Sequence, residues 1–295
     1  MSKLIGPLLI LLCTVIWGSA FIAQKLGASY YGPFTINFSR NLIAGVFLVC
    51  VLAVTKRLRG RWTRQEVVGG ALGGVCLFFA MLAQQCGIEY TTAGISAFLT
   101  ANYVIFVPFF AWIVGRKRPS LFLVLCAVLA VWGSFLISVS TREGLCVVGR
   151  GELLTILCAM LFAVQILIVG IFAPACDVLR FSAVQMIVAG LVAFPFVFLP
   201  SEVAHLNWDS CLRGVLSLFY LGIFSSGIAY TLQNFGQART SPPLAALVMS
   251  LESVFGAFFG WFILGDILTP RQLLGCGLVF LSVVASQALP FYEKK

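Results

Sequence analysis

The sequence predicts an all-α membrane protein with ten transmembrane helices, arranged as two inverted five-helix repeats. Three observations support this fold class. Of the 295 residues, 61% are hydrophobic and only 10% are charged, a composition outside the range of soluble globular domains. The charged residues divide the chain into apolar runs long enough to cross a hydrocarbon core of about 30 Å. The two halves of the chain can also be aligned with each other.

The spans follow from the positions of the charges. Eight runs between charged residues hold more than 20 uncharged residues each, and two further apolar runs contain one charge apiece, Arg40 and Glu252. Because backbone groups in lipid must be paired within their own segment, runs of this length are helices. The predicted spans are about 4–25, 33–55, 67–88, 92–115, 120–141, 153–176, 181–201, 213–236, 242–265 and 272–290.

Orientation follows from the basic residues, which concentrate on the cytoplasmic side of membrane proteins. With the N-terminus in the cytoplasm, 13 of the 19 Lys and Arg residues fall on that side and 5 on the other. Reading the first apolar run as a cleaved signal peptide would invert this bias, so we interpret it as the first helix. We therefore expect a multi-pass protein of the cell membrane, plasma or inner, with both termini in the cytoplasm.

An internal repeat appears when the chain is shifted by about 150 residues. The predicted helix, turn, helix and following break of the first half then align with those of the second half without a gap. The aligned pairs include Leu82 with Leu232, Val104 with Val254, Phe109 with Phe259, Gly115 with Gly265 and Cys126 with Cys276. Nearer the start of each half, a smaller offset aligns Phe21 with Phe162 and Gln24 with Gln165.

The repeat divides the chain into residues 1–143 and 150–295, joined by the polar stretch "STREGLCVVGRG". Each half holds five predicted spans, an odd number, so the second half must enter the membrane inverted. Inverted repeats give two related conformations, each open to one side, which alternating access requires. This pattern favours transport over a receptor or a structural role.

Three stretches resemble the drug/metabolite transporter superfamily, EamA type: "WGSAFIAQKL", "NFSRNLIAG" and above all "SLESVFGAFFGWFILGD". The resemblance covers the whole chain. It implies a central cavity between the halves, with helices 5 and 10 more peripheral. It also implies a carrier of amino acids, their derivatives or other small organic compounds, and we expect an exporter. The family often has proline after the ninth-helix glutamate, where this chain has Ser253, so we expect a straighter helix here.

Arg40 and Glu252 are the ionisable residues predicted to lie within spans, where a charge is retained only with a partner or a water-filled cavity. Their predicted depths differ by only about 5 Å at 1.5 Å per residue. We expect both to face one cavity, either as an ion pair or as separate contacts to substrate. Glu252 has two readings that the sequence leaves open. It is either a hydrogen-bonding group that joins helices, or a group that handles substrate or a coupling proton.

Other polar and aromatic residues in the spans complete a candidate pathway. Asn37 and Arg40 share a face of helix 2 with Asn41, and Asn102 is the repeat equivalent of Glu252. For each of these residues, packing or an interhelical hydrogen bond is the alternative role. The candidates for the substrate or proton pathway are Trp17, Phe21, Asn37, Arg40, Gln84, Asn102, Tyr103, Tyr230, Asn234 and Glu252, and Gln233 joins them as a cavity residue.

Other functional classes lack their motifs. The single histidine and the absence of HExxH, an aspartate-rich motif, a nucleophile elbow or GxxxxGK[ST] argue against an enzyme, a metal site, a cofactor and ATP-driven transport. The ten cysteines form no CxxC pair and are interpreted as packing residues. The net charge of +9 follows from the orientation bias and requires no nucleic acid. The partners expected are a small-molecule substrate and the bilayer, and a lipid-facing exporter or scramblase is the alternative function.

Overall fold

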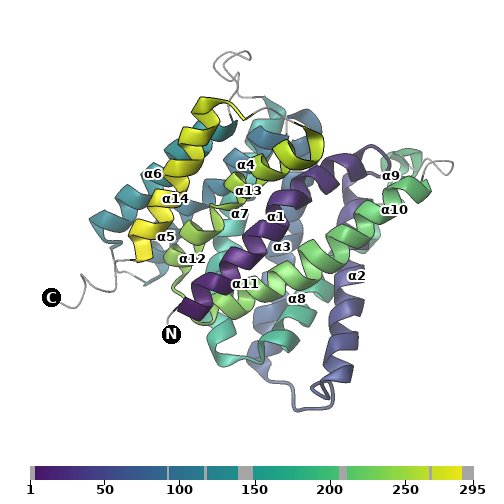
Figure 1. Cartoon of the computed structure of the whole chain (residues 1–295). Helices are drawn as coiled ribbons and strands as arrows, with labels where there is room; N and C mark the ends of the chain where they lie inside the picture. Colours follow the sequence, from purple (N-terminus) through teal and green to yellow (C-terminus); the bar gives the residue numbers. More distant parts are fainter. Residues whose placement is uncertain are drawn as a thin grey trace.

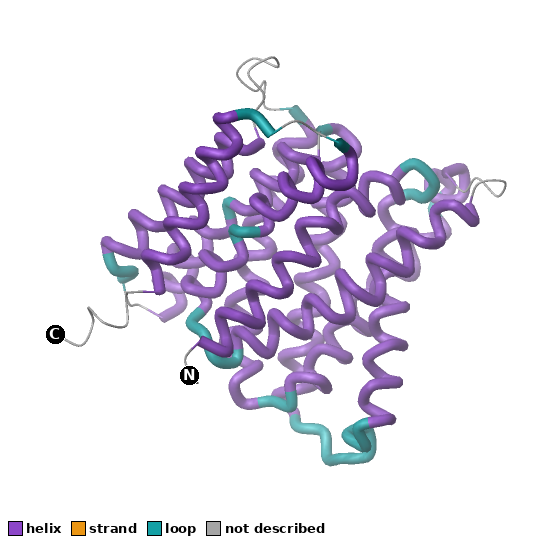
Figure 2. The backbone as a smooth tube through the Cα atoms, in the orientation of Figure 1, coloured by secondary structure: helices purple, strands orange, loops and turns teal. Residues whose placement is uncertain are grey.

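The computed structural model describes residues 4–91, 93–115, 118–138, 149–205, 211–265 and 268–287. Helices joined by short connections make up nearly all of this described part, and it contains no β-strand (Figure 2). The predicted junction of the two halves, at 140–151, lies mostly outside the described residues. Six of the basic residues counted for the orientation also lie outside them: Lys3, Arg116, Lys117, Arg142, Lys294 and Lys295.

The first half contains α1 to α6. Its second helix starts at a proline, which suits the first helical turn because no backbone N–H is needed there. Its third helix starts at a capping box formed by Thr63 and Glu66. The bounds are α1 Ile5–Ala28, α2 Pro33–Val54, α3 Arg64–Tyr90, α4 Ala93–Ala101, α5 Tyr103–Gly115 and α6 Leu121–Ser138.

The second half repeats this order with more interruptions. Short 3-10 segments, η2 and η3, follow its first two helices, and π-helical segments, η4 and η5, lie within its third and fourth. The bounds are α7 Arg150–Phe172, η2 Ala173–Ala175, α8 Val178–Ala193, η3 Phe194–Phe198, α9 Pro200–His205, α10 Cys211–Phe219, η4 Tyr220–Ala229, α11 Tyr230–Gln237, α12 Pro242–Met249, α13 Glu252–Phe259, η5 Gly260–Leu264 and α14 Pro270–Gln287.

The ten predicted spans agree with this architecture. In the described part of the chain, eight helices are long and apolar enough to cross a membrane, and two shorter apolar helices, 121–137 and 270–286, stand where the fifth and tenth spans are expected. The fourth span is formed by α4 and α5 together, the eighth by α10, η4 and α11, and the ninth by α12, α13 and η5. The prediction of an all-α membrane fold is therefore confirmed.

The two halves interlock (Figure 1). Helix α1 packs against η4 and α11 of the second half, and α7, its counterpart, packs against α3 of the first. Likewise α2 contacts η4 while α8 contacts α3, and α2 and α8 pack against each other. These contacts are exchanged when the halves are exchanged, as a two-fold relation between the halves requires.

Helices α6 and α14 form a pair at one side of the molecule (Figure 1). They approach each other at Gly133 and Gly275, where a Cβ atom on either residue would lie 2.7 Å or less from the carbonyl oxygen of the other. Only glycine permits this approach, which is the small-residue packing typical of membrane helices. The peripheral position that the family resemblance implies for these two helices agrees with this pairing at one side.

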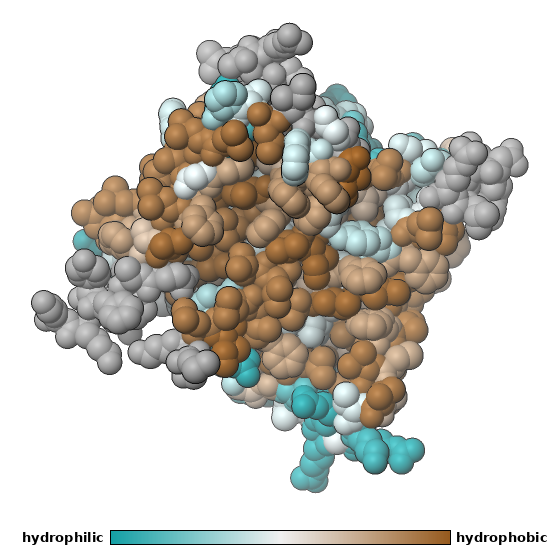
Figure 3. All heavy atoms as spheres, in the orientation of Figure 1, coloured by the Kyte–Doolittle hydropathy of each residue, from teal (hydrophilic) through white to brown (hydrophobic). Residues whose placement is uncertain are grey.

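The outer surface is suited to lipid. Figure 3 shows hydrophobic residues across the middle of the visible face and hydrophilic residues gathered at its lower edge. Exposed side chains on this surface include Leu42, Val46, Leu191 and Leu216. In water such an area would drive aggregation, whereas in a bilayer it meets acyl chains.

Two buried carboxylates cap helices of the opposite half. Glu66, at the start of α3, accepts a hydrogen bond from the backbone N–H of Asp177 (3.0 Å) just before α8. Glu202, in α9, accepts from the backbone N–H of Thr35 (2.9 Å) and from its hydroxyl (2.7 Å) at the start of α2. Each carboxylate thus satisfies helix N–H groups that have no partner within their own helix.

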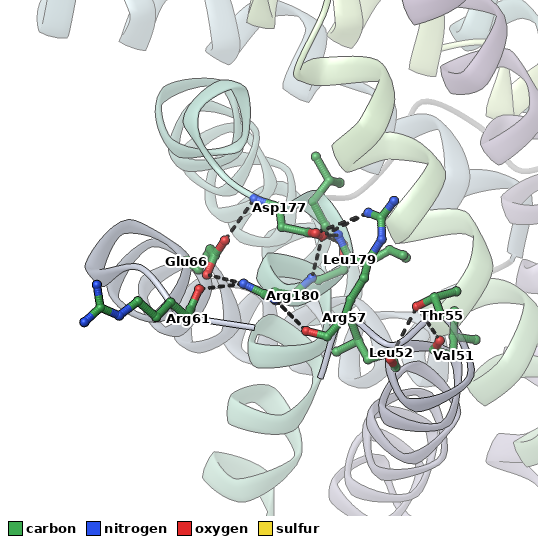
Figure 4. A network of polar contacts seen from close by, with 11 residues as sticks. Val51, Leu52, Thr55, Arg57, Arg61, Glu66, Asp177, Leu179 and Arg180 are labelled. Carbon is green, nitrogen blue, oxygen red and sulfur yellow. Dashed lines mark hydrogen bonds and ion pairs between the residues drawn. The ribbon is translucent and has the colours of Figure 1, made fainter. Parts of the chain in front are cut away.

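A polar network surrounds the first of these caps (Figure 4). The guanidinium of Arg180 donates to the backbone carbonyls of Arg57 (2.6 Å) and Arg61 (2.6 Å) and lies 3.8 Å from Glu66. Arg57 in turn forms an ion pair with Asp177 (3.2 Å). The network ties the connection between α2 and α3 to the start of α8, so part of the basic cluster at 56–64 has a structural role.

Candidate functional site

The helical hydrogen-bond pattern breaks in the fourth and ninth spans at similar places. Helix α12 ends at Met249 and α13 begins at Glu252, and α4 ends at Ala101 with α5 beginning at Tyr103. The repeat places these breaks within two residues of each other. Both spans still continue as one helix, over 95–115 and 242–263, and Ser250 and Leu251 keep helical backbone angles. The straighter ninth helix expected from Ser253 therefore stays a prediction. At the break, Oγ of Ser250 donates to the carbonyl of Leu247 (2.7 Å) and Oγ of Ser253 to that of Ser250 (2.9 Å), and such bonds compete with the helical backbone pattern.

A cavity lies between the halves beside these breaks. Its empty space, including its opening, is about 430 Å³. Side chains from both halves line it, so it is the central cavity that the sequence analysis expects. The lining residues are Trp17, Ala20, Phe21, Gln24, Arg40, Gln84, Thr100, Tyr103, Phe162, Gln165, Ile166, Ser225, Tyr230, Gln233, Met249 and Glu252.

Arg40 supplies a positive charge to the cavity wall. Its side chain is only 3% exposed, and two hydroxyls of η4 hold it: Nε donates to Oγ of Ser226 (2.9 Å) and one terminal nitrogen to Oγ of Ser225 (2.9 Å). Neither hydroxyl carries a charge, and a guanidinium has five N–H donors. The arginine therefore keeps donors and an uncompensated charge for an anionic group.

The π-helical segment η4 contributes more than hydroxyls. The indole N–H of Trp17 donates to the backbone carbonyl of Ser225 (3.1 Å). A π-helix changes the register of the backbone hydrogen bonds, and such segments occur frequently at functional sites. The same segment thus fixes both Arg40 and Trp17 at the cavity wall.

Glu252 supplies a carboxyl group to the same cavity wall. It is 4% exposed, and its Oε1 atom has no hydrogen-bond partner among the described residues. The Tyr103 side chain lies within interaction range of this carboxyl, but the geometry of a hydrogen bond is not met and the Tyr103 hydroxyl is unpartnered too. The two readings of Glu252, as a group that joins helices and as a group that handles substrate or a coupling proton, both stay predictions.

The two charges share the cavity without pairing. Both residues line it, but within the described part of the chain the ion pairs formed by an arginine are Arg57 with Asp177 and Arg180 with Glu66. Arg40 and Glu252 therefore form no ion pair with each other in this structure, and separate contacts to a substrate stay a prediction.

Aromatic and amide groups fill the space around these charges. Trp17 and Tyr230 pack with ring centroids 4.8 Å apart, and the repeat equivalents Phe21 and Phe162 both line the cavity. Aromatic faces with a few convergent polar groups are typical of sites for small organic molecules.

Seven of the ten candidate residues line the cavity and three lie elsewhere. Asn234 donates to Oγ of Ser182 and to Oε1 of Gln185, both at 2.9 Å. Asn102 donates to backbone carbonyls of its own helix, 3.2 and 3.3 Å away. Asn37 does the same through a 3.4 Å contact to Pro33. In this structure all three make interhelical or local hydrogen bonds, the alternative role that the sequence analysis names.

Four polar lining residues are not among the candidates predicted from sequence: Gln24, Thr100, Gln165 and Ser225. A signal for two of them exists, because Gln24 and Gln165 are equivalent in the repeat and each is an amide within an apolar helix. Ser225 has no such signal, since a serine in a membrane helix is common and the π-helical register is not visible in sequence.

Comparison with known proteins gives a consistent result. The model of the EamA-like transporter family matches the chain twice, over residues 4–139 and 149–286. An uncharacterized transporter of Archaeoglobus fulgidus is 28% identical over 96% of this chain and 86% of its own length. The S-adenosylmethionine/S-adenosylhomocysteine transporter of Chlamydia muridarum is 26% identical over 92% of this chain and 90% of its own. A solved crystal structure shares the fold, with a TM-score of 0.78 at 15% identity over 96% of this chain and 98% of its own.

Proposed function

Because the chain belongs to the EamA-like transporter family, we propose that it is a secondary carrier that exports small amphoteric metabolites, such as amino acids and their derivatives, by alternating access. The family and the names of the relatives make the chain a multi-pass membrane transporter and not an enzyme. The proposal adds the class of substrate, the direction and the mechanism. It also places the protein in the cell membrane with both termini in the cytoplasm.

The observation that carries the substrate class is the unpaired charge of each sign in one cavity. Arg40 offers donors to a carboxylate, and Glu252 offers an acceptor to an ammonium group. A charge buried at membrane depth without a partner is costly. A substrate that carries both charges would supply both partners at once, which favours binding of zwitterions over singly charged compounds.

One relative supports this class. The Chlamydia muridarum protein is named for S-adenosylmethionine and S-adenosylhomocysteine, and both compounds carry an amino group beside a carboxylate. Aromatic side chains such as Trp17, Phe21 and Tyr230 would pack against the larger part of such a molecule.

Alternating access is supported by the duplicated fold, because carriers built from inverted repeats open to each side through related conformations. The helical hydrogen-bond pattern is also interrupted at similar places in the two halves, near Asn102 and between Met249 and Glu252, beside the cavity. We propose that Glu252 exchanges a coupling proton as the cavity opens to each side in turn.

Purified protein in liposomes tests the proposed function. We expect radiolabelled L-methionine or S-adenosylhomocysteine loaded on one side to be exchanged or accumulated under an imposed proton gradient, and protein-free liposomes to show neither. Vesicles of known orientation assign the direction. Movement of fluorescent phospholipid between leaflets without a gradient, and no solute flux, would instead identify a scramblase and overturn the proposal.

A further inference from the structure

A chain of three glutamines connects α7 to α11 at one end of the cavity. Nε2 of Gln237 donates to the backbone carbonyl of Ile166 (2.9 Å). Nε2 of Gln233 donates to Oε1 of Gln237 (2.8 Å) and to Oε1 of Gln165 (3.2 Å). All three side chains are at most 2% exposed. We call Gln165, Gln233 and Gln237 the amide relay.

The carbonyl of Ile166 fixes the direction of the amide relay. A carbonyl only accepts, so the amide of Gln237 must present its nitrogen there and its oxygen to Gln233. Gln233 must then present its nitrogen, which donates one N–H to Gln237 and the other to Gln165. The orientation of all three amides therefore follows from one backbone acceptor.

Two atoms of the relay remain without a partner among the described residues. They are Oε1 of Gln233, an acceptor, and Nε2 of Gln165, a donor. Both residues line the cavity. Leaving buried polar atoms unpaired is costly, so a ligand with a donor for the first and an acceptor for the second would bind favourably here.

This requirement selects a chemical class. A carboxylate has no hydrogen-bond donor and an alkylammonium has no acceptor. A carboxamide, a cyclic amide or an amino-substituted nitrogen heterocycle has a donor next to an acceptor. Each amide also has an aromatic residue one helical turn before it, Phe162 before Gln165 and Tyr230 before Gln233, and both rings line the cavity. Aromatic faces suit planar groups of this kind.

We propose that Gln165 and Gln233 form a binding subsite for a neutral planar group with adjacent hydrogen-bond donor and acceptor. The subsite rests on the proposed function, because it would hold the part of the substrate that Arg40 and Glu252 do not bind. It distinguishes amide-bearing and heterocyclic substrates from aliphatic ones of the same charge.

Binding of matched pairs to the purified protein tests the subsite. The pairs are L-glutamine and L-glutamic acid 5-methyl ester, nicotinamide and methyl nicotinate, and adenosine and purine riboside; in each pair the second compound lacks the donor. Affinity is measured by calorimetry or by the shift in melting temperature. We expect the first member of at least one pair to bind at least about fivefold tighter. Equal affinities in every pair, or no binding of any compound, would overturn the proposal.

Gln165→Glu sharpens this test. The variant keeps an oxygen for Gln233 but replaces the free donor with an acceptor, so we expect the preference within a pair to fall below about twofold. Gln24→Glu adds the same charge at the repeat-equivalent position. It should keep the ratio of affinities within each pair, even where the absolute affinities change. If Gln165→Glu does not fold, Gln165→Met removes the donor in the same way.

The outcomes separate the subsite from the carrier function. A preference unchanged in Gln165→Glu, or lost equally in Gln24→Glu, would show that another part of the cavity selects the ligand. Gradient-driven flux of L-methionine would then still support the proposed function. Conversely, an intact preference with no flux of any compound would overturn the carrier function and leave the subsite standing.

Discussion

At the scale of single residues, the cavity is lined by one arginine, Arg40, and one glutamate, Glu252. Sequence alone identifies them, because a charge in an apolar run is conspicuous. It does not show how they are satisfied. Arg40 is held by Ser225 and Ser226, and no pattern distinguishes these serines from other small residues in membrane helices. The separation of the two charges depends on side-chain directions that helical depth alone does not fix.

A charge swap tests this separation. If Arg40 and Glu252 were an ion pair, combining Arg40→Glu with Glu252→Arg would restore the melting temperature and the flux that each single variant lowers. Because Arg40 is bound by hydroxyls that would face a carboxylate in the variant, we expect no restoration of melting temperature or flux. Recovery of either quantity in the double variant would contradict the arrangement. Arg40→Gln alone should weaken binding of L-methionine about 10-fold to 100-fold, the loss of a charge-assisted hydrogen bond.

Glu252→Gln tests the coupling role. The change keeps the size of the side chain and removes its ability to exchange a proton. We expect solute exchange to persist in liposomes and accumulation driven by a pH gradient to be lost, with a melting temperature close to that of the unmodified protein. Accumulation that still follows the pH gradient would remove Glu252 from the coupling step. Asn102→Asp, at the equivalent position, should leave the coupling unchanged because Asn102 is bound to its own helix.

At the scale of helices, the sequence predicts the spans well and their interruptions poorly. Apolar length defines a span, since any helix that crosses lipid needs about 20 residues. The change of hydrogen-bond pattern in the ninth span occurs instead where the hydroxyls of Ser250 and Ser253 donate to backbone carbonyls of their own helix. Serine is common in membrane helices, so sequence does not show which serines do this.

The cap that Glu202 places on α2 gives a prediction about helix stability. Glu202→Ala removes the acceptor of the Thr35 N–H and hydroxyl, and all three groups are buried. We expect the free energy of unfolding to fall by about 2 kcal/mol, seen as a lower melting temperature. Glu202→Gln keeps one acceptor oxygen and should lose about half as much. Val203→Ala is the control, because Val203 is 54% exposed in the same helix. An equal loss in all three variants would show that α9, and not the cap, sets stability.

At the scale of the whole molecule, the duplication is visible in sequence although few of the aligned residues are identical. Packing explains this. The halves share equivalent helix contacts, because α1 packs on α11 and η4, and α7 packs on α3. Many different apolar residues can form such contacts. The lining of the cavity is less predictable from sequence, because it depends on which faces of several helices converge. Aligning the halves residue by residue recovers part of it, as the pair Gln24 and Gln165 shows.

The inverted arrangement of the halves leads to a prediction about access from the two sides of the membrane. Arg59 and Val203 both follow the second long helix of their half, and both are exposed. In a background without native cysteines, Arg59→Cys and Val203→Cys are labelled in intact cells and in inverted vesicles with a membrane-impermeant maleimide. Halves of five spans in opposite orientation should place Arg59→Cys on the cytoplasmic side and Val203→Cys on the other. Labelling of both from the same side would indicate halves in parallel orientation, in which case the cavity could not open to each side by the exchange of equivalent conformations.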